Sequence, residues 1–339
     1  MRGTDNLREY LQEAILPKMM HNPNSPPMPL PGHKSHLNNL KVRPESWRRL
    51  ESMYLLQEEC QFATAVSTWA ESKIPRRPLE EDDEDPVSGV SLTVPCPNAS
   101  RYEIPLYKET RPDNIARLFK WIDTYPLTTV ERTMHLLHPE LKKWRFSLPD
   151  DYHSPGDINI FQHFMWKLSE EGIGRLNPAG LRVVQRKQVV IAFQPPWVLS
   201  PQDMKAFVRC RSYPTYRAPG HAYPTELQSE ERLWGRLWDL CVHRNTPWFV
   251  LTSYHQWVFG RFSDRWTAAH ITDIYEWNAS SPTIIECLAF WTANAMDLTN
   301  FALPQVCESD SKSMACQTIC TVYDAMVQGN RAAIALYHL

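Results

Sequence analysis

The sequence has little glycine and none of the glycine-rich loops that hold nucleotides. Only 11 of its 339 residues are glycine. No G-x-x-x-x-G-K or G-x-G-x-x-G pattern occurs, so we expect no nucleotide cofactor. No apolar run approaches the roughly 18 residues that a membrane-spanning helix needs, which predicts a protein without membrane contact. The first residues, MRGTDNL, lack the apolar core of a signal peptide.

Paired cysteines are also missing. The eight cysteines form no C-x-x-C pair, and Cys60, Cys241 and Cys287 lie in apolar stretches with helical spacing. This placement is typical of buried thiols in a reducing compartment. We therefore expect a cytoplasmic or nuclear protein without a metal site.

The formal net charge is −2, so a whole-protein attraction to nucleic acid is absent. The charges are unevenly distributed, however. Residues 80–85 are six consecutive acids, whereas residues 181–270 hold twelve Lys and Arg against six Asp and Glu. The sequence thus predicts a modestly basic module whose charge is masked by acidic residues elsewhere.

Proline content and hydrophobic spacing divide the chain into five parts. We expect a helical N-terminal region (1–74), an acidic proline-rich linker (75–98), a helical extension (99–156), an α/β core (157–297) and a C-terminal tail (298–339). Helical spacing predicts helices over 5–20, 44–72, 113–125 and 128–144, and a further helix that begins at Asp157 and buries Phe161, Phe164 and Met165.

The core has the clearest pattern. A run of β-formers, 189–194, ends at Pro195 and Pro196, because two prolines stop the pairing of a strand. A helix with a wide apolar stripe follows Pro224. Two further strands are predicted at 248–253 and 257–262, and an apolar helix at 282–296. This order predicts an α/β fold with a buried sheet.

Two segments of this core resemble the restriction-endonuclease-like, or PD-(D/E)XK, superfamily. They are WFVLTSYHQWVFGRF (248–262) and VVIAFQPPW (189–197), separated by an amphipathic helix. The resemblance covers residues 157–297 and is closest to nuclease-like domains of uncharacterised fungal proteins. It implies a mixed central sheet flanked by helices, preceded here by an α-helical, loop-rich N-terminal region.

The resemblance also implies a catalytic set that this chain lacks. The superfamily uses an Asp at the start of one strand and, on the next, an acid two residues before a Lys, which together hold a divalent metal against the scissile phosphate. In this chain Ala179, in NPAGLRVV, takes the place of the first acid. Ala192 and Gln194 take the places of the second acid and the lysine. The resemblance therefore implies a degenerate, non-catalytic domain that binds nucleic acid or a protein partner and needs no cofactor.

Two other functions stay open. Acids that have migrated would restore a Mg²⁺-dependent phosphodiesterase, and the available ones are Glu170, Glu171, Glu226, Glu230 and Glu231. That function needs two carboxylates close together beside the Ala192 strand. A protein-interaction module unrelated to nucleic acid would instead show an exposed apolar patch.

Basic residues of the core are the candidates for nucleic-acid binding. They are Arg182, Arg186, Lys187, Arg209, Arg211, Arg261 and Arg265, together with Arg217. These side chains either line one surface that binds along a phosphate backbone, or they are dispersed over the solvent-exposed surface without a common role. Tryptophans such as Trp234, Trp238, Trp248 and Trp257 are available for stacking on bases, but their spacing favours the core.

Overall fold

The computed structural model describes residues 6–42, 47–56, 62–76, 111–149, 160–214 and 226–306. Its centre is an eight-stranded mixed sheet in the order β1-β7-β6-β5-β4-β3-β2, with β8 paired to β6. The strands are β1 (Ser52–Leu55), β2 (Trp144–Ser147), β3 (Gln162–Leu168), β4 (Val189–Phe193), β5 (Trp248–Thr252), β6 (Gln256–Phe262), β7 (Ala268–Ile271) and β8 (Tyr275–Glu276). β4 runs parallel to β5, and β1 runs parallel to β7. The expected α/β class with a mixed sheet is confirmed.

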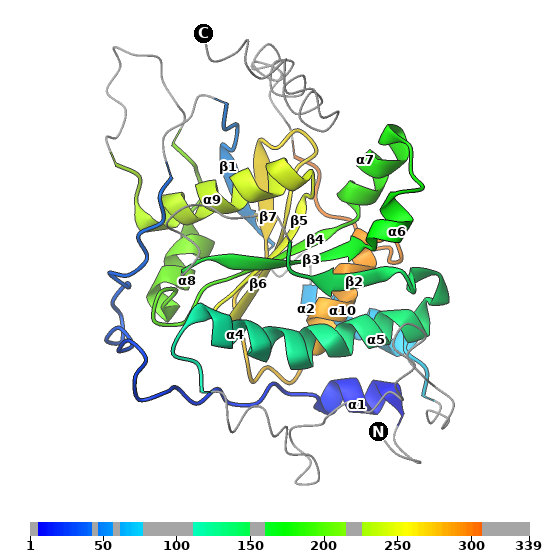
Figure 1. Cartoon of the computed structure of the whole chain (residues 1–339), viewed down its shortest axis with the longest axis horizontal. Helices are drawn as coiled ribbons and strands as arrows, with labels where there is room; N and C mark the ends of the chain where they lie inside the picture. Colours follow the sequence, from blue (N-terminus) through cyan, green and yellow to red (C-terminus); the bar gives the residue numbers. More distant parts are fainter. Residues whose placement is uncertain are drawn as a thin grey trace.

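Helices cover both faces of the sheet (Figure 1). The helical segments are α1 (Leu7–Glu13), α2 (Phe62–Lys73), α4 (Ile115–Ile122), η2 (Asp123–Leu127), α5 (Thr128–Leu137), η3 (Pro139–Leu141), α6 (Glu170–Ile173), α7 (Pro178–Arg186), α8 (Pro201–Arg209), α9 (Ser229–Arg244) and α10 (Ile284–Ala295). One core contains side chains of α1, α2, α4, α5 and α10, and the other contains side chains of α8 and α9. No helix in the described ranges is long and apolar enough to cross a bilayer.

β4 is the buried centre of the sheet, as its sequence predicts. All five of its residues are completely buried. Ile191 and Phe193 contribute to the first core, whereas Val190 and Ala192 contribute to the second. This alternation follows from the two-residue period of a strand. The predictions of α9, β5, β6 and α10 are also confirmed.

The helix predicted from Asp157 is wrong, because residues 162–168 form strand β3. Phe161 and Met165 enter one core, while Phe164 and Trp166 enter the other. A spacing of four residues fits one face of a helix and also one face of a strand. The pattern was therefore ambiguous, and pairing with β4 decides it.

The expected placement of Ala179 at the start of a strand is also wrong, since Pro178–Arg186 form helix α7. Asn177 caps the helix by accepting a hydrogen bond from the Gly180 N–H at 2.7 Å, and Pro178 occupies the first turn. An Asn-Pro pair is a strong signal for a helix start. Ala179 consequently lies on an exposed helix and not beside Ala192.

Three of the predicted helices are shorter than expected. Within the described residues of 5–20, only α1, Leu7–Glu13, is helical. Within 44–72 the chain forms β1 and then α2, and within 128–144 α5 gives way to η3 and the start of β2. β1 and β2 come from the regions 1–74 and 99–156, and both join the sheet of 157–297. Arg217, residues 77–98 of the expected linker and residues 307–339 of the expected tail lie outside the described residues.

Candidate functional site

The strand ends of β4 and β5 define two candidate regions. We call the end at Phe193 and Thr252 the carboxyl edge and the end at Val189 and Trp248 the amino edge, since the two strands are parallel and in register between these residues. In open α/β sheets, ligands bind beyond the carboxyl ends of the strands. The positions that the resemblance singles out, Ala192 and Gln194, lie at the carboxyl edge.

Gln194 is sealed from solvent. Its side chain is 0% exposed. Its Nε2 donates to Asn38 Oδ1 at 3.2 Å, and its backbone N–H donates to the Thr252 carbonyl oxygen at 3.1 Å. An approaching phosphate or metal ion would have to displace Asn38, which comes from the far N-terminal part of the chain.

The N-terminal segment, residues 14–42, covers the carboxyl edge and runs along that side of the molecule in blue (Figure 1). The Tyr254 hydroxyl donates to the Pro17 carbonyl oxygen at 2.7 Å. Farther along, the Ser35 hydroxyl donates to the Trp197 carbonyl oxygen at 2.5 Å. These contacts fix the segment over the loops that follow β4 and β5, so the edge is filled by the chain itself.

Asp203 is the carboxylate that anchors this segment. Its Oδ2 accepts hydrogen bonds from the Ser35 N–H at 2.8 Å and from the Ser200 hydroxyl at 2.5 Å. It also completes the capping box of α8. Asp203 is buried, and its Oδ2 binds both the start of α8 and the N-terminal segment. Within the described ranges, no group of three or more His, Cys, Asp or Glu side chains is placed to hold a metal ion.

A histidine pair lies at the same edge. The rings of His21 and His255 are 5.4 Å apart and nearly perpendicular, and the ring of Trp197 lies 6.1 Å from that of His21. Burial lowers the pKa of His255 to about 4, with smaller contributions from His21 and Lys18. Burial also lowers the pKa of His21. Both imidazoles are therefore neutral at pH 7 and act as packing groups.

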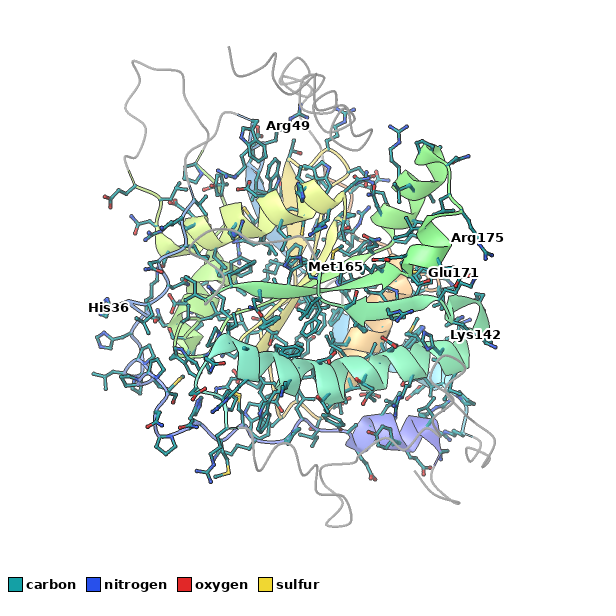
Figure 2. The ribbon with its side chains drawn as sticks, viewed as in Figure 1. His36, Arg49, Lys142, Met165, Glu171 and Arg175 are labelled. Carbon is teal, nitrogen blue, oxygen red and sulfur yellow. The ribbon has the colours of Figure 1, made fainter. Side chains whose placement is uncertain are left out.

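This pair was missed by sequence reasoning. His21 lies in a proline-rich stretch, which indicates an extended chain but names no partner. The other histidines of the N-terminal segment, His33 and His36, are exposed, and His36 points away from the fold (Figure 2). Only the folded arrangement distinguishes His21 from them.

The strand beside Ala192 is β3. In the antiparallel register His163 lies opposite Ala192, and Gln162 lies opposite Phe193. The described residues at the start of β3, Phe161, Gln162 and His163, include no carboxylate.

The acids proposed as migrated ligands are engaged elsewhere. Glu171 pairs with Arg175 at 2.9 Å, near the end of α6 (Figure 2). Glu230 pairs with Lys34 at 2.6 Å, and Glu231 completes the capping box at the start of α9. Glu170 lies in the first turn of α6, and Glu226 is an exposed residue before α9.

Basic side chains gather at the amino edge. Arg261 contacts Asp264 at 2.9 Å, and Arg186 contacts the same carboxylate oxygen at 3.4 Å. The Arg261 guanidinium lies 5.1 Å from the ring centre of Trp248. Burial is the main cause of a lowered pKa for Arg261, although an arginine stays charged at any physiological pH.

The remaining candidates extend this surface. Lys187 pairs with Asp297 at 2.9 Å. Arg182 lies one turn before Arg186 on α7, Arg265 follows Asp264, and both are exposed. Arg209 ends α8, and the Arg211 carbonyl oxygen accepts the Met53 N–H of β1 at 3.0 Å, which places Arg211 at the β1 side of the sheet. Five of the candidates, Arg182, Arg186, Lys187, Arg261 and Arg265, therefore belong to the amino edge.

The tryptophans confirm the core assignment. Trp234, Trp238, Trp248 and Trp257 are buried.

Comparisons of this chain with protein-family models, with curated proteins and with solved structures found no match.

Proposed function

We propose that residues 157–297, with β1 and β2 added to the sheet, form a restriction-endonuclease-like core that binds nucleic acid without cleaving it. The observation that carries the proposal is the basic surface at the amino edge, where two arginines share one carboxylate and two further arginines are exposed. The restriction-endonuclease-like assignment itself rests on the resemblance of the 189–197 and 248–262 segments.

The carboxyl edge supports the absence of cleavage. Ala192 offers a methyl group where the superfamily has an acid, and the described residues at the start of β3, Phe161 to His163, offer no carboxylate. Gln194 carries no charge and is completely buried beneath Asn38. Mg²⁺ needs oxygen ligands with room for several waters. A sealed amide and a methyl group do not meet this need.

The amino edge supports phosphate binding. Each guanidinium has five N–H donors, so a single Asp264 carboxylate leaves donors on both Arg186 and Arg261 for other acceptors. Arginine matches the oxygens of a phosphate through paired hydrogen bonds. The Trp248 ring beneath Arg261 restricts this side chain and reduces the entropy that it loses on binding. A phosphate backbone fits such a surface better than an apolar peptide does.

The number of basic side chains at the amino edge sets the expected affinity. With four to five phosphate contacts, the logarithm of the binding constant should fall with the logarithm of salt concentration with a slope of about −4. We expect binding that is clear at low salt and weak at physiological salt, without strong sequence preference, because contacts to phosphates carry no sequence information.

The test uses the full chain with labelled DNA and RNA, single- and double-stranded, titrated from about 50 to 200 mM salt. A parallel assay adds Mg²⁺ or Mn²⁺ and follows strand cleavage. Salt-sensitive binding with intact strands is the expected result. Metal-dependent cleavage that co-purifies with the protein would contradict the non-catalytic assignment, and an absence of binding at the lowest salt would contradict the nucleic-acid assignment in favour of a protein partner.

A further inference from the structure

A cavity of about 450 Å³ lies between α2 and the turn that follows α10. One wall is the exposed face of α2, with Thr64, Thr68 and Lys73, and the other is the turn at residues 298–301. Its volume falls in the range of about 300 to 1,000 Å³ that is usual for small-molecule sites.

The cavity has an aromatic floor. Trp69, Phe290 and Phe301 line it. The Phe290 ring meets the rings of Trp69 and Phe301 edge-on at 5.8 and 5.5 Å, so the three rings support one another. Flat apolar groups pack well against such a floor, because offset and edge-on ring contacts are favourable.

The turn that forms the second wall is firmly held. The Leu298 N–H donates to the Ala293 carbonyl oxygen at 2.9 Å, and the Thr299 hydroxyl contacts Asn294 Oδ1. The Phe301 N–H donates to the Thr299 hydroxyl at 3.2 Å. The opening is therefore built from fixed backbone on one side and a helix on the other.

One polar group gives the cavity a preference for an anion. Lys73, exposed at the rim, forms no ion pair with any described carboxylate, so its ammonium group is available to an anion.

We infer that this cavity binds a small aromatic anion, with its ring on Phe290 and Phe301 and its acidic group at Lys73. The cavity adjoins the amino edge, because Asp297, which precedes Leu298 of the cavity wall, pairs with Lys187 at 2.9 Å. The two proposals use different residues and different probes, so each can fail without the other. The aromatic floor favours the ring, and the ammonium group of Lys73 favours the acidic group.

The probe is anilinonaphthalene sulfonate, with the uncharged phenylnaphthylamine as its neutral counterpart. Binding to the full chain is followed by probe fluorescence and by calorimetry. We expect saturable binding of one sulfonate probe per chain. Lys73→Gln should weaken the sulfonate probe about fivefold and leave the neutral probe unchanged, since only the sulfonate uses the charge. The control Lys120→Gln removes an exposed lysine of α4 and should change neither.

Filling the cavity gives the second test. Thr68→Trp places a large ring in the space and should weaken both probes about tenfold or more. Glu71→Trp puts the same ring on an exposed position of α2 outside the cavity and should have little effect. Ala65→Leu is a smaller filling variant for use if Thr68→Trp does not fold by circular dichroism. Equal binding to the Thr68→Trp and Glu71→Trp proteins, or no saturable binding to the wild type, would overturn the inference.

Discussion

The two ends of the parallel strands β4 and β5 differ sharply. At the carboxyl edge the N-terminal segment covers the sheet, Gln194 is completely buried, and the Asp203 Oδ2 is engaged inside the protein. At the amino edge Arg182 and Arg265 are exposed, and Arg186 and Arg261 share one exposed carboxylate. The end where α/β folds commonly bind ligands is thus filled by the chain itself. The charged surface is at the other end.

The largest expected effect comes from placing a lysine at the buried position 194, where the resemblance implies one. Gln194→Lys would bury an ammonium group in a site that offers Asn38 but no carboxylate partner, and we expect a loss of about 4 kcal/mol of unfolding free energy. Urea denaturation measures this loss. Arg265→Lys, which keeps the charge at the exposed amino edge, should change stability by less than about 0.5 kcal/mol. A fully stable Gln194→Lys protein would show that the carboxyl edge is open.

Asp203→Ala tests the anchoring of the N-terminal segment. It removes the capping box of α8 and leaves the buried Ser35 N–H without its acceptor, which should cost about 3 kcal/mol. Asp264→Ala removes a carboxylate of the same type from the exposed amino edge and should cost well under 1 kcal/mol. Similar losses in the two variants would remove the distinction between the edges.

The histidine pair predicts how stability depends on pH. The folded-state pKa of His255, about 4, lies below its ordinary value of 6.5, so the unfolded chain binds a proton more readily than the folded protein. The contribution of neutral His255 is therefore complete above pH 6.5 and is lost as the pH falls towards 4. We expect a loss of about 2 kcal/mol, discounted because the ring is only half-buried.

The measurement is the urea midpoint across this pH window. His255→Asn should flatten the decline, whereas His36→Asn, at an exposed position, should not. An unchanged pH profile in the His255→Asn protein would mean that this imidazole titrates normally in the folded state.

The smallest effect concerns the shared carboxylate. Asp264→Asn removes the negative charge that Arg186 and Arg261 share, so the two cations should bind phosphate more strongly, with an affinity gain of about threefold at low salt. Asp273→Asn makes the same charge change beyond the end of β7 and should leave binding unchanged. Weaker binding by the Asp264→Asn protein would show that this acid positions the arginines and does not compete with phosphate.

The sequence predicted the central elements because their signals were local and unambiguous. A five-residue run rich in β-formers, followed closely by Pro195 and Pro196, became β4, and the segment with an apolar stripe after Pro224 became α9. β3 was mistaken for a helix because a spacing of four residues suits both structures. β1 was missed because a four-residue strand is stabilised by β7, more than 200 residues away in the sequence.

The two edges were beyond sequence reasoning for a different reason. Nothing local indicates that Asn38 lies on Gln194, or that His21 meets His255, since these pairs are far apart in the chain. The basic candidates were found by composition, but their gathering at one edge depends on the β6–β7 turn, which brings Asp264 to Arg186. The Ala179 assignment failed because the Asn177-Pro178 helix start was overlooked.

The most direct test of the central claim compares salt titrations of nucleic-acid binding. The variant is Arg182→Gln/Arg265→Gln, which removes two exposed cations of the amino edge, and the control is Lys120→Gln/Lys205→Gln, which removes two exposed cations of α4 and α8. We predict that the first variant binds about tenfold more weakly and that its salt slope is smaller by about 2, while the control matches the wild type. Equal slopes in all three proteins would contradict the assignment of binding to the amino edge.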